Sequence, residues 1–164
     1  MRCLLSVSLL LAMLPVAPAQ AASCWNREDI FAAKVRDLDT LLTEVSRRCV
    51  AAGLSAQADY DMYRAANRGA ISATNQRLKA RFWTVFGAEK AGARLDSFHD
   101  ALASQYATVP AVQENCGQVS ALAREAAATG GSVPGLVAVA DRNNLTPPLP
   151  GGACRAAALA VAAR

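Results

Sequence analysis

The side chains whose types and spacing are best suited to chemistry are one histidine and two close pairs of aspartates. His99 has acidic neighbours at Asp96 and Asp100, so an enzymatic mechanism would use this imidazole as its acid or base. The chain has no second histidine to complete a metal site with it. The pattern therefore favours a solvated histidine on a helix surface over a catalytic or metal-ligating one.

The aspartate pairs have the pattern of neither a calcium loop nor a carboxylate dyad. Asp37/Asp39 and Asp59/Asp61 are spaced by two residues within expected helices, where side chains at this spacing point to different sides. The sequence also contains no EF-hand loop, no C-x-x-C-H haem motif, no phosphate-binding loop and no serine-hydrolase motif. We therefore expect a protein that is not an enzyme, with no catalytic residue, no metal and no cofactor.

The N-terminus has the features of a signal peptide. An apolar run over residues 4–14 follows Arg2 and is too short to span a bilayer. Small residues around Ala21 and Ala22 suit a signal peptidase, so we predict a signal peptide over residues 1–22. The mature protein is then expected in the periplasm or outside the cell, without a transmembrane segment.

The cysteines favour disulfides over a lipid anchor. Removal of the signal takes away Cys3 and leaves an even number of cysteines, which in an exported chain favours two disulfides. Lipidation of Cys24 would leave an odd number, and the residues before Cys24 lack the bulky aliphatic side chain usual in a lipidation motif. The cysteines that remain are Cys24, Cys49, Cys116 and Cys154.

Apolar residues that recur at steps of three and four predict an all-α fold. Between Asn26 and Val50, for example, they mark one face of a helix. We expect residues 23–154 to form one domain, an up-and-down bundle of four main helices and a short fifth, followed by an Ala-rich tail over residues 155–164. The expected helices cover residues 26–50, 55–86, 89–106, 112–128 and 132–143.

The bundle topology restricts which cysteines can pair. Cys24 and Cys49 flank the first helix and lie roughly 37 Å apart at helical rise, whereas a disulfide needs Cα atoms within about 7 Å. Consecutive helices joined by short loops run in alternating directions, which brings Cys116 to the end of the bundle that holds Cys49. The same alternation returns Cys154 to the end that holds Cys24. We predict the pairs Cys49–Cys116 and Cys24–Cys154.

Two groups of side chains are candidates for binding. Trp83 lies off the apolar stripe beside Phe82, so it is either an exposed interface anchor or a cover for a helix overhang. Asn67 and Thr74 interrupt the stripe that contains Tyr63. These polar residues either line a pocket between helices or hydrogen-bond across a helix contact.

Two functions follow from these candidates. The first is a non-enzymatic envelope protein that binds another protein or a surface component. The second is a carrier of a small molecule, with its pocket near Tyr63, Asn67 and Thr74. Nucleic acid is not an expected partner, because the net charge of +4 falls to only +3 without Arg2. The sequence does not indicate an oligomeric state.

Several short motifs resemble a family of small exported proteins of Gram-negative bacteria, some of which are labelled "S-layer protein". The resemblance implies an exported helical protein that contains cysteines, and it implies no particular activity and no catalytic residues. The motifs that carry it are Cys24-Trp25, Val35-Arg36-Asp37-Leu38, Cys49, Leu78-Lys79-Ala80, Tyr106, Cys116, and Pro150-Gly151-Gly152 with Cys154.

Overall fold

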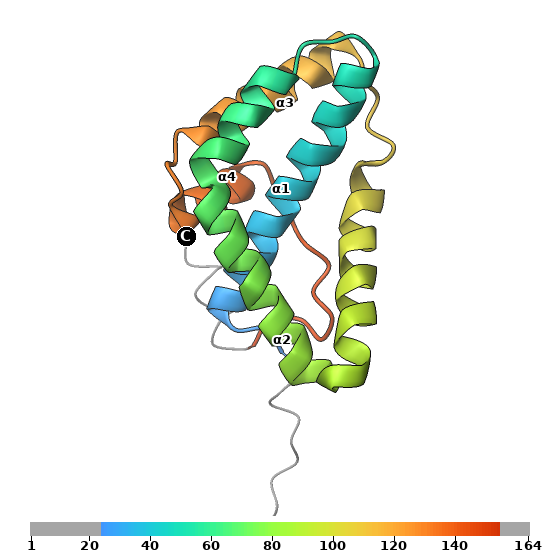
Figure 1. Cartoon of the computed structure of the whole chain (residues 1–164), viewed down its shortest axis with the longest axis vertical. Coiled ribbons are helices and arrows are strands. Elements are labelled where there is room, and N and C mark those ends of the chain that lie inside the picture. The colour runs from blue at the N-terminus through green and yellow to red at the C-terminus, as the bar shows by residue number, and fades with distance from the viewer. Residues whose placement is uncertain (1–23, 155–164) are drawn as a thin grey trace, which may run out of the picture.

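The computed structural model describes residues 24–154. The predicted signal peptide and Ala-rich tail lie outside the described residues. Within the described range the fold is all-helical, as predicted, and none of its segments forms a named strand (Figure 1). The helices are α1 (Arg27–Ala51), α2 (Gln57–Tyr106), α3 (Gln113–Ala127) and α4 (Val133–Arg142).

The number of helices differs from the prediction of four main helices and a short fifth. The expected second and third helices form one element, α2, which changes direction at Gly87 (Figure 1). Gly87 has φ 71° and ψ 168°, a conformation that is open almost exclusively to glycine. A single residue therefore reverses the chain, and the two halves of α2 run along opposite sides of the molecule without a loop between them.

α1 is the central helix, and the residues at its two ends stabilise it as the sequence suggests. The side-chain oxygen of Asn26 accepts a hydrogen bond from the backbone N–H of Asp29 at 2.9 Å, which caps the first turn. Glu28 lies near the positive end of the helix dipole and Arg48 near the negative end. The buried apolar face of α1 packs into the core with residues Val35, Leu38, Leu42, Val45 and Cys49.

A second apolar cluster fills the end of the molecule near the α2 reversal. Trp25 is its centre, with ring centroids 5.7 Å from Phe82 and 6.1 Å from Phe98. Phe82 belongs to the first half of α2 and Phe98 to the second half. Contacts between aromatic rings thus tie the two halves of α2 to the start of the domain.

Both disulfides have the predicted pairing. Cys49–Cys116 joins the end of α1 to the start of α3, and Cys24–Cys154 joins the two ends of the described chain. The backbone supports the second bond, because Trp25 N donates to Gly152 O and Cys154 N donates to Trp25 O, each at 2.8 Å. The indole N–H of Trp25 also donates to Pro150 O at 2.8 Å. We call this arrangement the terminal clasp.

Among the helices of residues 24–154, none combines the length and the apolar character needed to cross a membrane.

Candidate functional site: a polar cleft between α1 and α2

A polar cleft of about 340 Å³ opens between α1 and the two halves of α2. Pockets for small ligands typically measure roughly 300–1,000 Å³, so this cleft has room for a small molecule only. We call it the α1–α2 cleft. The charged and titratable side chains that line it are Arg36, Asp39, Glu44, Tyr60, Arg64, His99 and Asp100.

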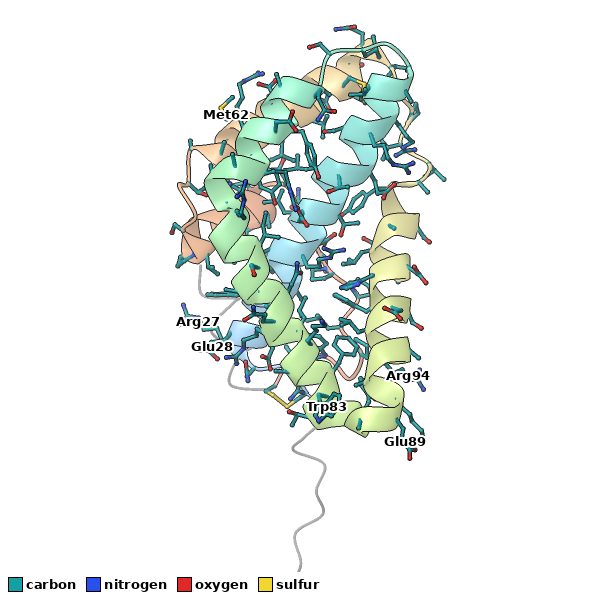
Figure 2. All side chains as sticks on the ribbon, viewed as in Figure 1. Arg27, Glu28, Met62, Trp83, Glu89 and Arg94 are labelled. Carbon is teal, nitrogen blue, oxygen red and sulfur yellow. A yellow bond between two sulfur atoms is a disulfide. The ribbon has the colours of Figure 1, made fainter. Side chains whose placement is uncertain are left out.

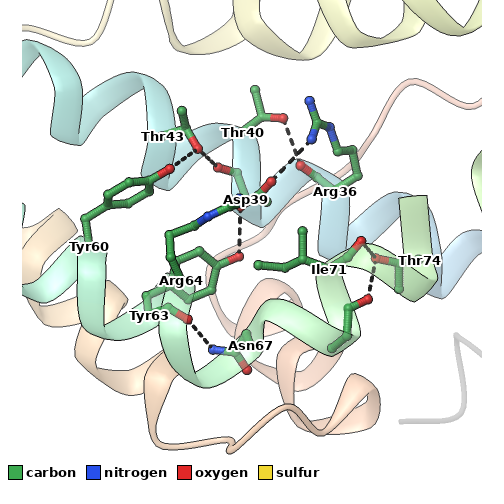
Figure 3. Close-up of polar contacts among 11 residues, drawn as sticks. Arg36, Asp39, Thr40, Thr43, Tyr60, Tyr63, Arg64, Asn67, Ile71 and Thr74 are labelled. Atoms are coloured by element: carbon green, nitrogen blue, oxygen red, sulfur yellow. Dashed lines mark hydrogen bonds and ion pairs between the residues drawn. The ribbon is translucent and has the colours of Figure 1, made fainter. Parts of the chain in front are cut away.

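Asp39 forms the floor of the α1–α2 cleft, and its side chain is only 4% exposed. Its Oδ1 accepts from Arg64 Nη1 at 2.8 Å, and its Oδ2 accepts from Arg36 Nη1 at 3.3 Å (Figure 3). The phenol of Tyr63 donates to Oδ1 at 3.3 Å, and burial raises the pKa of Tyr63, so this donor keeps its proton. A buried carboxylate requires such partners, and here they hold two guanidinium groups beside the cavity.

The wall next to this floor is a chain of hydroxyl groups. Thr43 Oγ1 donates to the backbone carbonyl of Asp39 at 2.7 Å. Because this bond uses the only hydroxyl proton of Thr43, the 3.0 Å contact with Tyr60 Oη has Tyr60 as its donor (Figure 3). The phenolic oxygen of Tyr60 keeps its capacity to accept a hydrogen bond from a ligand.

His99 forms the opposite wall, where it is half-buried. Burial lowers the pKa of His99, the positive charge of Arg36 lowers it further, and Asp96 and Asp100 oppose the effect. The imidazole is therefore neutral at neutral pH. The expectation of a solvated histidine on a helix surface is corrected here, because the reversal of α2 places its second half against α1.

Two buried atoms of the cleft have no hydrogen-bond partner among the described residues. They are Nε of Arg36 and Nε2 of His99. Both side chains line the α1–α2 cleft. A buried polar atom without a partner costs about 1–3 kcal/mol. Neither atom is open to solvent, so a bound molecule gains these hydrogen bonds only when the side chain rotates towards the cleft.

The pocket predicted near Tyr63, Asn67 and Thr74 is occupied by the protein itself. Asn67 is fully buried and uses its whole hydrogen-bonding capacity within the bundle. It donates to the carbonyls of Tyr63 and Ala126 and accepts from the hydroxyl of Thr129 and the backbone N–H of Gly131, each at 3.0 Å. No polar atom of Asn67 is left for a ligand.

Tyr63 and Thr74 are likewise accounted for by internal contacts. Tyr63 is fully buried and reaches the cleft only through Asp39. Thr74 is buried, and its hydroxyl lies 2.9 Å from the carbonyl of Ala70 one helical turn back. The sequence leaves open whether these side chains line a pocket or hydrogen-bond across helix contacts and to nearby backbone. The structure shows the second arrangement.

Trp83 is 61% exposed, in agreement with the interpretation of an exposed residue. It lies at the end of the molecule beside the α2 reversal, with Glu89 and Arg94 on the following half of the helix (Figure 2). The other large exposed apolar residues described are Val50, Met62 and Val112, which belong to other parts of the fold. Trp83 is therefore a single exposed apolar side chain rather than part of a broad apolar patch.

The described residues contain neither a cluster of metal ligands nor a free thiol. No group of three or more His, Cys, Asp and Glu side chains within residues 24–154 has an arrangement that could hold a metal ion. The cysteines in this range are all joined in disulfides. What the α1–α2 cleft offers is two guanidinium groups, one neutral imidazole, the hydroxyl of Tyr60 and the carboxylates of Asp39, Glu44 and Asp100.

No protein-family model, no curated protein and no solved structure matches this chain. The resemblance to exported helical proteins therefore stays a prediction, and the α1–α2 cleft is the feature of the molecule that bears on function.

Proposed function

We propose that this protein is an exported, non-enzymatic binding protein that holds a small polar ligand in the α1–α2 cleft. One observation carries the proposal: two side chains that line the cleft, Arg36 and His99, each keep a buried nitrogen, Nε and Nε2, that has no partner among the described residues. A polar ligand in the cleft would supply the missing hydrogen bonds once these side chains rotate towards it.

Binding is favoured over catalysis by the composition of the cleft lining. Serine and cysteine are absent from the side chains that line the described cleft, so His99 has no hydroxyl or thiol nucleophile of these types to activate there. The hydroxyl of Thr43 is engaged with the backbone of Asp39. The polar groups are thus arranged to hold a molecule.

Export is supported by the two disulfides. Such bonds persist in oxidising compartments, which include the periplasm and the outside of the cell. We propose one of these two locations for the mature protein.

The test is native mass spectrometry of the oxidised protein released from the compartment to which it is exported. We expect a small molecule that stays bound under native conditions and is released on denaturation. Ala103 lines the cleft, so Ala103→Phe should fill the cavity and remove the ligand. Ala101→Phe is the matched control, because Ala101 is exposed on the same half of α2.

A protein that carries no small molecule, and whose cleft resonances in NMR spectra respond to no sugar, polyol, carboxylate or amino acid, would contradict the proposal. Equal occupancy in the Ala103→Phe and Ala101→Phe variants would contradict the placement of the ligand in the α1–α2 cleft.

A second candidate function is binding to another envelope protein or to a surface component through Trp83. The specific observation is the 61% exposure of this side chain next to the α2 reversal. Exposed tryptophans are common interface anchors. Purified envelope fragments should then shift the fluorescence of Trp83 to the blue. The Trp83→Phe variant should show no shift, because the other tryptophan, Trp25, is already buried.

A further inference from the structure

We infer that the ligand of the α1–α2 cleft is a small zwitterion of the amino-acid type, whose carboxylate binds at Arg36 and His99 and whose ammonium group faces Asp100. This inference rests on the proposed binding function and adds the chemical class of the ligand. It follows from three features of the cleft: its unused donors, its neutral imidazole and its one unpaired acidic group.

The unused donors call for an acceptor with negative charge. Arg36 spends Nη1 on a long 3.3 Å contact with Asp39, while its Nε–H has no partner among the described residues. Arg64 also contacts Asp39 through Nη1, and its side chain is 44% exposed, so the rest of its guanidinium group is accessible. A guanidinium group presents its N–H donors in a planar fork that matches the two oxygens of a carboxylate.

His99 completes the carboxylate end of the site. Its neutral imidazole carries one donor and one acceptor nitrogen, and the buried Nε2 has no partner in the described part of the chain. A carboxylate next to Arg36 would accept a hydrogen bond from protonated Nε2 once the ring turns this buried nitrogen towards the cleft. The negative charge of the ligand would also offset the effect of Arg36 on the imidazole, so binding should raise the pKa of His99.

The acidic groups of the cleft determine which charge the other end of the ligand carries. Asp39 is already paired with Arg36 and Arg64. Glu44 is paired with Arg47 at 2.8 Å. Asp100 is exposed at the cleft and forms neither an ion pair nor a hydrogen bond through its side chain with the other described residues.

This distribution of charge favours a zwitterion over the other classes of small polar ligand. A dicarboxylate would bring a second negative charge towards Asp100, at an electrostatic cost. A neutral sugar would leave the charges of the guanidinium groups and of Asp100 without a counter-charge. A molecule with a carboxylate inside and an ammonium group outside complements both ends of the cleft, and the cavity of about 340 Å³ limits it to a small one.

The experiment follows the imidazole signals of His99, which is the single histidine of the chain. The oxidised mature protein is titrated with pools of the standard L-amino acids at millimolar concentration, and the NMR pKa of His99 is measured with and without each pool. We expect a saturable change in the His99 signals and an upward shift of its pKa. The corresponding carboxylic acid without the amino group should bind about 10-fold more weakly or worse.

Two variants locate the ammonium group. Asp100→Asn should remove the preference for the amino acid over its deaminated counterpart while binding of the carboxylate persists. Asp96→Asn is the matched control, because Asp96 is exposed on the same half of α2 and does not line the described cleft. It should keep the preference.

The outcomes separate this inference from the proposed function. Equal binding of the deaminated acid, or binding of sugars or polyols alone, would overturn the zwitterion and leave the binding function standing. An absence of any His99 response to the amino acids overturns the zwitterion. If the other three classes of compound also produce no response, the binding function fails with it.

Discussion

Asp39 of α1 and Arg64 of α2 form an ion pair of 2.8 Å that joins two helices at the floor of the α1–α2 cleft. The two partners differ in solvent exposure, because the Asp39 side chain is 4% exposed and the Arg64 side chain is 44% exposed. Water can replace Asp39 as a partner of Arg64, whereas it has little access to Asp39. Loss of Arg64 therefore costs stability mainly because it removes a partner from the buried carboxylate of Asp39.

Replacement of this arginine should destabilise the protein. We expect Arg64→Leu to lower the free energy of unfolding by about 1–3 kcal/mol, because a buried acceptor loses its strongest donor. Arg68→Leu is the matched control on the same exposed side of α2, and it should change stability by less than about 0.5 kcal/mol. Urea unfolding with the disulfides intact measures both. Similar losses in the two variants would show that the ion pair contributes little.

The histidine of the cleft should make stability depend on pH. The pKa of His99 is lowered in the folded protein by burial and by Arg36, so the unfolded chain binds a proton more readily than the native one. Stability from this group is present above the unfolded pKa of about 6.5 and is lost as the pH falls through the folded pKa. We expect His99→Gln to lose less stability than the unsubstituted protein between neutral and mildly acidic pH.

Comparing the two proteins at each pH isolates the contribution of His99 to the free energy of unfolding. Both proteins contain the other charged groups near it, which are Asp96, Asp100, Arg36 and the remaining groups of the cleft. Parallel curves of unfolding free energy against pH would exclude a contribution from the imidazole.

The hydroxyl of Tyr106 should stabilise the protein through a buried carboxylate. Asp37 is fully buried, and Tyr106 Oη donates to its Oδ1. Burial raises the pKa of Asp37, while the Tyr106 hydrogen bond and the nearby Lys34 lower it. We expect Tyr106→Phe to cost about 1–3 kcal/mol at neutral pH, and less in acid, where Asp37 is protonated and needs less compensation.

The control for this variant is Tyr60→Phe, which removes a hydrogen bond to Thr43 at a partly exposed site and should cost about 1 kcal/mol or less. Denaturant unfolding at neutral and at acidic pH provides the measurement. An equal cost at both pH values would mean that the charge of Asp37 plays no part.

Two glycines of α2 should respond in opposite ways to alanine. Gly87 has a positive φ and no atom within 4 Å of an added Cβ, so Gly87→Ala meets backbone strain alone. We expect it to cost about 1–3 kcal/mol. Gly92 lies in the helix with equally open space, so Gly92→Ala should stabilise by about 0.4–1 kcal/mol. Thermal unfolding compares the pair, and a stabilising Gly87→Ala would contradict the conformation of the reversal.

The terminal clasp should contribute strongly to stability. The Cys24–Cys154 bond spans a sequence separation of 130 residues, and closing so long a loop stabilises by about 3–5 kcal/mol in the chain-entropy description. The Cys24→Ser/Cys154→Ser double variant should lose that amount in urea unfolding. A non-reducing peptide map should still contain the Cys49–Cys116 pair, and an acyl group on Cys24 in the unsubstituted protein would contradict the clasp.

The sequence predicts the all-helical fold and the cysteine pairing because both depend on short-range regularities. Apolar periodicity shows which face of each helix turns inward, and alternating helix directions then place the cysteines at one end or the other. The number of helices is less predictable. A glycine between two helical patterns does not show whether a loop or a single reversing residue joins them, as at Gly87.

The α1–α2 cleft could not be predicted in the same way. Asp39 and Arg64 are separated by 25 residues, and His99 reaches the cleft only because α2 reverses. In the sequence, Asp39 stands out only as the second member of a close aspartate pair. The available signal was its place beside Leu38 on the buried side of the first helix, since a charge there requires a partner from another helix.

The terminal clasp also determines how the domain responds to mechanical tension. The chain enters at Cys24 and leaves at Cys154, and the Cα atoms of these two residues are only 4.9 Å apart. A pulling force applied to the two ends of the domain passes through the Cys24–Cys154 bond. The helices between these two cysteines therefore bear no load. The folded domain should therefore act as an inextensible link that yields to force only after chemical reduction.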